Sequence, residues 1–248
     1  MLNTGKGRGE TGLLATLQKY GGEVPEANTS RAIVALSGMP KSGKTHFGLS
    51  APDPIVIYNL DEGIREIVGK FVSKSIYSIP LEVERGKEDW ERFETSFAEM
   101  VQCPDIRTIV VDTESELVEL ARMAEWGRTT AKQHHHGKVN SKYRQVMRLA
   151  ANSHVNLILL RQMRKVYVTV GVGEKAEKVW SGAWEPVGMT KIDYMVHVVG
   201  ELRRNRSAGE FELEIQNCRQ VPELDQVVLR GGSVDFATLG VLLGLDIP

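Results

Sequence analysis

The sequence predicts an α/β protein with a mainly parallel sheet, helices on both of its faces and antiparallel strands in its C-terminal part. Short apolar runs rich in β-branched residues recur along the chain, as expected for strands that are buried on both faces. Helical patterns separate these runs, which favours parallel strands joined by crossover helices. After about residue 192 the helical patterns give way to consecutive strand patterns.

Each expected element can be placed on the chain. The strands of the parallel part are expected at residues 32–36, 55–58, 108–111 and 155–160. The helices between them are expected at residues 89–102, 114–125 and 141–153. In the C-terminal part, strand patterns cover residues 194–199, 211–215 and 227–229, and residues 236–245 predict a short final helix.

Size and composition are those of an ordinary globular chain. The 248 residues are enough for one large domain, and the formal net charge of −1 does not by itself favour a nucleic-acid partner. Cys103 and Cys218 make no disulfide framework, so we expect a reduced, cytoplasmic setting. The N-terminus has no apolar signal region, and no run approaches the roughly 18 apolar residues of a membrane span, so no membrane partner is expected.

The chain divides into a predicted arm, residues 1–29, and a predicted core, residues 30–248. Residues 1–12 are rich in Gly, Lys, Arg and Glu, which is typical of a flexible segment. Leucines 13, 14 and 17 then form an apolar cluster at helical spacing, followed by a glycine- and proline-containing linker. Two interpretations stay open: the short helix packs on its own core, or it docks on a neighbouring subunit.

The strongest motif lies directly after the first predicted strand. Residues Gly38-Met39-Pro40-Lys41-Ser42-Gly43-Lys44-Thr45 fit the phosphate-loop pattern G-x-x-x-x-G-K-[ST]. The glycines let the backbone wrap around a phosphate group, and the N–H groups of the loop and the following helix point at it. Lys44 is expected to contact the β- and γ-phosphates of ATP, Thr45 to bind Mg²⁺, and His46 to complete the nucleotide-binding set.

Three carboxylates are candidates for the rest of the ATP site. Asp112 ends the third predicted strand, where a carboxylate holds Mg²⁺ through water; a helix N-cap role is compatible with this. Asp61 and Glu62 follow the second strand, and an ATPase needs a carboxylate to orient or deprotonate the attacking water. One of this pair is the catalytic candidate; the other interpretation is a solvated turn.

Residues 146–152 (VMRLAAN) and 156–165 (NLILLRQMRK) resemble a helix and strand of the RecA-type recombinases. The resemblance implies a RecA-like P-loop NTPase core. In that family the strand ends in an Asn-Gln step, whose glutamine senses the γ-phosphate and signals to a mobile DNA-binding loop. Gln162 falls on that position and is a catalytic candidate, whereas Arg161 stands where the family has asparagine.

A second resemblance lies near the C-terminus. Residues 218–223 (CRQVPE) resemble a Cys-Leu-Pro-Glu step of archaeal and eukaryotic recombinases, which caps ATP bound to the adjacent subunit. The resemblance implies a homo-oligomer with ATP at the interface and makes Arg219 the candidate that reaches across. A RecA core of this length also resembles phage-encoded single-strand annealing ATPases, which would act in the host cytoplasm.

From Trp126 through Gly173 the sequence contains no acidic residue but many cationic ones. In the RecA resemblance this stretch covers two DNA-binding loops, about residues 126–141 and 163–188. The expected DNA-binding residues are Arg128, Lys132, Lys138, Lys142, Arg164 and Lys165. Tyr167, Trp180 and Trp184 lie in or beside the second loop and could stack on bases. A solvated positive face is the other interpretation, and no metal site is expected at His134, His135 and His136.

These observations favour an ATP-dependent single-stranded DNA-binding protein of RecA type that hydrolyses ATP, with DNA stimulation, in recombination or single-strand annealing. A single-strand-binding protein is a further expected partner. The alternative is a P-loop ATPase that remodels or loads a protein partner in DNA replication. A small-molecule kinase is a third interpretation, but no acceptor pocket or lid arginines can be identified for it.

Overall fold

A computed structural model of the chain describes residue 19 and residues 31–61, 63–130, 136–171, 177–189 and 191–246. The predicted arm, residues 1–29, lies outside these ranges except for Lys19. Its expected helix, and the choice between the two docking interpretations, therefore stay predictions.

The centre of the described chain is an eight-stranded sheet with the order β10-β9-β8-β1-β5-β4-β2-β3. Its strands are β1 (Ile33–Gly38), β2 (Ile55–Asn59), β3 (Ile76–Pro80), β4 (Thr108–Asp112), β5 (Asn156–Arg161), β8 (Val198–Asn205), β9 (Glu210–Cys218) and β10 (Val228–Arg230). The pairs from β3 through to β8 are parallel, and β9 and β10 join antiparallel. This topology confirms the predicted fold class.

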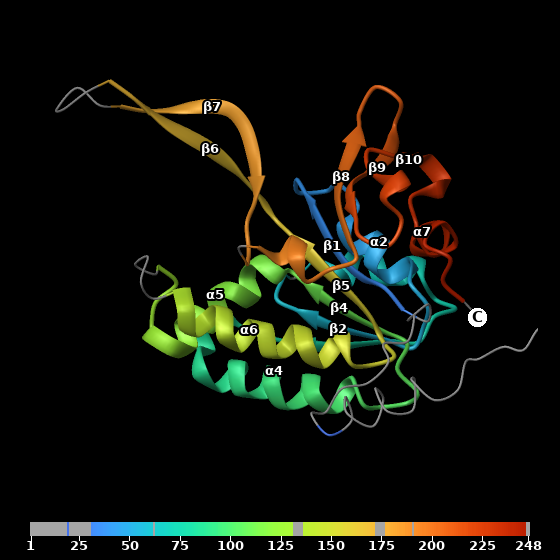
Figure 1. Cartoon of the computed structure of the whole chain (residues 1–248), viewed down its shortest axis with the longest axis horizontal. Coiled ribbons are helices and arrows are strands. Elements are labelled where there is room, and N and C mark those ends of the chain that lie inside the picture. The colour runs from blue at the N-terminus through green and yellow to red at the C-terminus, as the bar shows by residue number, and fades with distance from the viewer. Residues whose placement is uncertain are drawn as a thin grey trace, which may run out of the picture.

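Helices cover both faces of this sheet (Figure 1). One face carries α4 (Lys87–Met100), α5 (Glu114–Trp126) and α6 (His136–Ala151), and the other carries α2 (Lys44–Ser50) and α7 (Phe236–Leu242). The remaining short helices are α3 (Ile64–Ile67), η1 (Val68–Lys70), η2 (Val83–Arg85), η5 (Ile192–Tyr194), η6 (Pro222–Leu224) and η7 (Gly231–Ser233). Successive residues of β1 point to opposite faces, so Ile33 joins the core under α4 to α6 and Val34 joins the core under α2 and α7.

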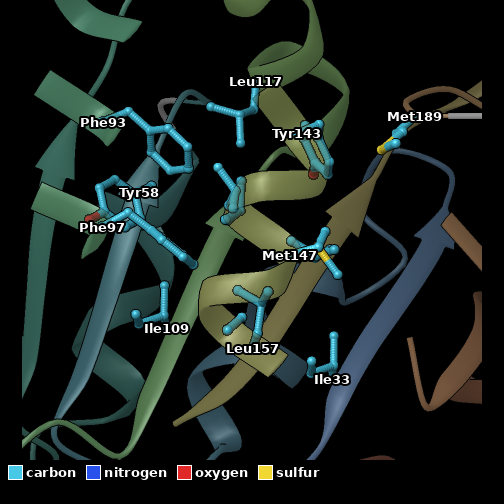
Figure 2. Packing of buried hydrophobic residues seen from close by; sticks show 14 of the residues in the cluster. Ile33, Tyr58, Phe93, Phe97, Ile109, Leu117, Tyr143, Met147, Leu157 and Met189 are labelled. Carbon is cyan, nitrogen blue, oxygen red and sulfur yellow. The ribbon is translucent and has the colours of Figure 1, made fainter. Parts of the chain in front are cut away.

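The larger core has an aromatic centre between α4 and β2 (Figure 2). Trp90, Phe93 and Phe97 recur at helical spacing along α4 and are buried. The ring of Tyr58 meets Phe93 edge-on, with 4.9 Å between centroids. Figure 2 also shows Tyr143 and Met147 of α6 and Met189 packed over the same face of the sheet. The core therefore holds α6 and the segment before β8 against the strands that carry the candidate site.

The sequence-based assignment misses β3 and misplaces β8. Strand β3 is an edge strand with mixed exposure, and Tyr77 within it is 61% exposed, so it has neither a continuous apolar run nor a clean alternation. The strand expected at residues 194–199 begins only at Val198, because Ile192–Tyr194 forms a 3₁₀ turn. The other elements predicted for residues 30–248 coincide with observed ones within five residues at each end.

The segment expected to be a DNA-binding loop, residues 163–188, instead contains two long strands. β6 (Met163–Val170) and β7 (Glu177–Pro186) pair antiparallel in a sheet of their own. We refer to them as the β6–β7 hairpin. In Figure 1 the hairpin extends away from the central sheet. Its β-branched and aromatic composition favours strands, and nearly all of its side chains are half-buried or exposed because no other described element covers it.

Candidate functional site

The phosphate loop joins β1 to α2, and its glycines are required by its geometry. A Cβ on Gly38 would lie 2.4 Å from Ser42 Oγ and 2.6 Å from the Leu202 carbonyl oxygen, so any larger residue would clash. Gly43 adopts φ 94°, in the left-handed region that other residues avoid. The backbone N–H of Ser42 donates to the Met39 carbonyl at 3.2 Å and closes the turn. The loop is thus a tight backbone cradle at the start of a helix.

Lys44 lies against this cradle. Its Nζ donates to the carbonyl oxygens of Gly38 and Met39 at 2.8 and 3.0 Å. Burial lowers the pKa of Lys44, and the nearby carboxylates of Asp112 and Asp61 act in the opposite direction. The cation is therefore held at the loop, where the expected contact with phosphates would form, and two carboxylates lie in electrostatic reach.

Thr45 and Asp112 come together at the carboxyl ends of β1 and β4. The Thr45 hydroxyl donates to Asp112 Oδ2 at 2.7 Å, and the Asp112 side chain is buried. Burial raises the pKa of Asp112 to about 6; the hydrogen bond from Thr45 opposes this, and Asp61 adds to it. A hydroxyl and a carboxylate oxygen are the hard ligands that Mg²⁺ prefers, and a buried carboxylate gains from a cation, so these residues fit the predicted magnesium site.

Asp61 lies beside the same centre. The backbone N–H groups of Leu60 and Asp61 donate to the carbonyl oxygen of Asp112 at 2.7 and 3.1 Å, so the end of β2 is tied to the end of β4. The Asp61 side chain is exposed and acts electrostatically on Asp112 and Lys44. Glu62 lies outside the described residues, so the choice between the two carboxylates stays open.

His46, the last residue of the predicted nucleotide-binding set, is exposed on the first turn of α2. Its ring lies 4.9 Å from that of Phe71, at a tilt of 57°. Burial and the nearby Lys70 lower its pKa, while Asp235 acts in the opposite direction. The contact places the Phe71 ring against His46, directly after the phosphate loop.

Gln162 is held by a residue that the sequence analysis did not identify. Its Nε2 donates to Glu116 Oε1 at 3.2 Å, and Glu116 lies in the first turn of α5. Burial raises the pKa of Glu116, and Glu119 and Asp61 add to the shift. A glutamate in a first helical turn is ordinary in sequence because it complements the helix dipole, so nothing distinguished this one.

The same turn of α5 holds both ends of the β6–β7 hairpin. Ser115 Oγ accepts from the backbone N–H of Gln162 at 2.9 Å and donates to the Val187 carbonyl at 2.7 Å. Val187 N donates back to the Gln162 carbonyl at 2.8 Å. Glu114 Oε1 accepts from the backbone N–H of Met189 at 2.9 Å. The turn that directly follows Asp112 is therefore the root of the hairpin.

One face of the hairpin is both aromatic and cationic. Lys165 Nζ lies 5.1 Å from the ring centre of Trp180 and 5.8 Å from that of Trp184. The two indoles meet edge-on with 6.3 Å between centroids, and Tyr167 pairs across the strands with Trp180. All three aromatic side chains are exposed. Arg164, by contrast, has its charge paired with Glu185 at 2.7 Å.

The other expected DNA-binding residues are more scattered. Lys138 and Lys142 of α6 both pair with Glu125, at 2.8 and 3.3 Å. Arg128 is exposed beyond the end of α5, and Lys132 lies outside the described residues. The first predicted loop therefore has less free positive charge than its sequence indicates.

Arg219 lies at the opposite end of the parallel strands from the phosphate loop of its own chain. Gly38 is level with Leu202 at the end of β8, whereas Cys218 pairs with Val198 at its start. Arg219 is exposed, and its Nη1 donates to the Tyr194 carbonyl at 3.5 Å. The strand register therefore puts Arg219 at the other end of the strands from the phosphate loop of its own chain, and its predicted role across subunits stays a prediction.

The described residues were compared with the requirements of a metal cluster and of a membrane span. They contain no cluster of three or more His, Cys, Asp or Glu side chains suited to a metal ion, while His134 and His135 lie outside them. No helix within the described ranges is both long enough and apolar enough to span a bilayer.

Residues 30–227 match the sequence pattern of the AAA domain family. No curated protein matches the chain. Among solved structures the chain is similar to the KaiC-like protein PH0186 from hyperthermophilic archaea, Pyrococcus horikoshii OT3. The two share 11% sequence identity with a TM-score of 0.47, over 84% of this chain and 94% of that one.

The raised pKa of Asp112 predicts a pH-dependent stability without nucleotide or metal. The pKa is about 6 in the folded chain against an ordinary value of 3.8, so between about pH 4 and 6 the folded state binds the proton more tightly. As the pH rises from about 4 to 6, the contribution of Asp112 to the free energy of unfolding should therefore fall by about 2–3 kcal/mol, and above pH 6 it should level off. Urea unfolding of wild type and Asp112→Asn at several pH values measures it. A difference between the two proteins that does not vary with pH would contradict the assignment.

Proposed function

Because the chain belongs to the AAA domain family of P-loop ATPases, we propose that it is a RecA-type ATPase that binds single-stranded DNA. In this proposal ATP binding and hydrolysis control a DNA-binding hairpin, and the protein acts in recombination or single-strand annealing. The observation that carries the proposal is the first turn of α5. It begins directly after Asp112, and its side chains hold both ends of the β6–β7 hairpin.

The residues of the ATP site have separate roles in this proposal. The phosphate loop and Lys44 bind the phosphates, and Thr45 and Asp112 hold Mg²⁺, which neutralises charge on the phosphate oxygens. Asp61 or Glu62 orients the attacking water. Gln162 lies between Glu116 and the hairpin, so a movement of its side chain toward the γ-phosphate would release one contact at the hairpin root.

The hairpin supports a single-stranded ligand. Proteins that bind single strands without sequence preference combine cations with exposed aromatic rings on which bases stack. Lys165, Trp180, Trp184 and Tyr167 provide this combination on one face. The alternative, an ATPase that loads a protein partner in replication, would use the same hairpin as a docking arm and is distinguished by the second experiment below.

The first prediction concerns hydrolysis. Lys44→Ala removes the cation that contacts the phosphates and should lower ATP turnover by about 10²–10³-fold or more without unfolding the protein. Lys87→Ala is the matched control, because it removes a lysine from an exposed surface pair with Glu91 far from the loop. A steady-state phosphate-release assay measures both. Parental turnover in Lys44→Ala would place the ATP site elsewhere.

The second prediction concerns DNA. Lys165→Ala should reduce the slope of log affinity against log salt for an oligo-dT strand by about 0.7, because one phosphate contact is lost. Trp180→Ala should weaken binding by about 1–3 kcal/mol with little change in slope, because a stacking surface is lost. Val179→Ala is the control: this valine is also exposed, but its neighbouring position in β7 puts it on the other face of the hairpin.

Fluorescence anisotropy over a salt series tests all three variants. If oligo-dT does not bind, or if the three variants bind it equally well, the DNA proposal is wrong and the protein-partner alternative is favoured.

The third prediction concerns assembly. We propose an oligomer in which Arg219 of one subunit contacts ATP held by the next, since Arg219 lies at the opposite end of the strands from its own loop. Lys44→Ala and Arg219→Ala should each be inactive alone. In an equal mixture about one quarter of the interfaces combine an intact Lys44 with an intact Arg219, so up to about that share of activity should return.

Size-exclusion chromatography with ATP and DNA establishes whether the two variants assemble together. Co-assembly without any return of turnover would remove Arg219 from the site, and a strictly monomeric protein would contradict the shared interface altogether.

A further inference from the structure

A polar cavity lies at the root of the β6–β7 hairpin, beside the ATP site but distinct from it. Its volume is about 700 Å³, and its wall is formed by α5, β5, the hairpin root, the segment before β8, and strands β8 and β9. Four cationic side chains line it: Arg122, Arg161, Arg164 and Lys191. We call it the Arg161 cavity. Of these four residues, only Arg164 was among the DNA-binding residues expected from sequence.

Arg161 is the most unusual of the four. It is only 6% exposed, and its Nε lies 3.5 Å from Glu114 Oε2. Its side chain forms no hydrogen bond with any described residue, and the buried Nε has no hydrogen-bond partner. A guanidinium group has five N–H donors, and buried charged groups normally have theirs satisfied. Arg161 therefore brings unsatisfied donors to the wall of the cavity.

The position of Arg161 is fixed by Glu114 and the groups around it. Glu114 is fully buried and accepts the backbone N–H of Met189. The Tyr143 hydroxyl lies near the same carboxylate and interacts with it electrostatically, although no hydrogen bond of ordinary geometry forms. Gly188 makes room for this group, since a Cβ there would lie 1.8 Å from Glu114 Oε2. A guanidinium that is already ordered loses little side-chain entropy when it binds a ligand.

The cavity retains uncompensated positive charge. Arg161 is paired with Glu114, and Arg164 is paired with Glu185, another lining residue. Arg122 and Lys191 form no ion pair with any described residue, and the one remaining lining carboxylate is that of Asp193. A cavity with an excess of Arg and Lys donors favours an anion, and a phosphate group matches the fork of an arginine better than a point charge does.

The size and surroundings of the cavity identify the kind of phosphate. About 700 Å³ is the volume of a ligand site rather than of a bare ion. A second hollow runs along the hairpin and is lined by Lys165, Tyr167 and Trp184, and it shares Arg164 and Glu185 with the Arg161 cavity. The two hollows therefore meet at the Arg164–Glu185 pair, so a strand that passes from the hairpin into the cavity reaches free cations.

We propose that the Arg161 cavity binds a phosphate group of a nucleotide unit in the single strand, with Arg161, Arg122 and Lys191 as its contacts. This inference rests on the proposed DNA binding and adds the place where one phosphate is held. Glu114, which pairs with Arg161, lies only two residues after Asp112, so the cavity and the magnesium carboxylate belong to the same short segment.

The test measures oligo-dT affinity over a salt series for three proteins besides the wild type. Arg122→Ala/Lys191→Ala removes two cations that take no part in an ion pair, and it should reduce the salt slope by up to about 1.4. Arg161→Gln/Glu114→Gln replaces the buried pair by neutral residues of similar size, so that no unpaired charge is left, and it should weaken binding at least tenfold. Lys87→Ala/Arg107→Ala is the control, with two exposed cations removed away from the cavity.

A second arm uses thymidine 5′-monophosphate, inorganic phosphate and thymidine as separate probes in calorimetric titrations. The monophosphate should bind the wild type more tightly than inorganic phosphate, and thymidine should not bind in the cavity. In the Arg122→Ala/Lys191→Ala variant, the monophosphate should no longer bind more tightly than inorganic phosphate. If inorganic phosphate binds as tightly as the monophosphate at a site that the wild type has and the Arg122→Ala/Lys191→Ala variant lacks, the site is one for a free anion and the proposal is wrong.

The outcomes separate this inference from the proposed function. If the wild type binds oligo-dT and both cavity variants match the control, the Arg161 cavity is not a phosphate site, while DNA binding stands. If the wild type does not bind oligo-dT, the proposed function is wrong. Monophosphate binding that the cavity variants lose would then still support the site, and equal binding by all the proteins, or none, would overturn it.

Discussion

The burial of the Asp112 carboxylate is the constraint on which the arrangement of the site depends. A buried carboxylate is costly unless a donor or a cation compensates it. Here the compensation comes from Thr45 and Lys44 of α2. This helix follows β1, which β5 separates from β4 in the sheet. The carbonyl of Asp112 in turn accepts two N–H groups from the end of β2. Because these strands are parallel, all of these groups lie at the same end of the strands. The electrostatic compensation of Asp112 therefore depends on the topology of the sheet.

The next four residues extend this constraint to the hairpin. Three carboxylates, Asp112, Glu114 and Glu116, all have a pKa that burial raises, and they surround the N-terminal end of α5. The helix dipole favours negative charge there, which offsets part of the desolvation cost. Each carboxylate has a different partner: the Thr45 hydroxyl, the Met189 backbone and the Gln162 amide. Acidic groups near one helix end therefore connect the phosphate-loop site to the segments that flank the hairpin.

The sequence predicted what depends on local pattern and missed what depends on distant contacts. Buried β-branched runs and the phosphate loop have local signatures, so the parallel strands and the Lys44 cradle could be predicted. The partners of Gln162 and Met189 lie 46 and 75 residues away, and no spacing rule identifies them. The acid-free stretch also overstated free charge, because Glu125 precedes it by one residue and pairs with both Lys138 and Lys142. The hairpin strands were obscured because the resemblance implied a loop.

The departure at Arg161 shows how such distant contacts depend on one another. An arginine at this buried position needs a counter-charge, and Glu114 supplies it. Glu114 can occupy its place only because residue 188 is a glycine, since a Cβ there would overlap the carboxylate. Losing either partner would leave a buried charge uncompensated, at a typical cost of about 3–5 kcal/mol. The three residues are far apart in sequence, yet the arginine requires the glutamate and the glutamate requires the glycine. The arginine therefore belongs to the construction of the hairpin root and is no isolated variation.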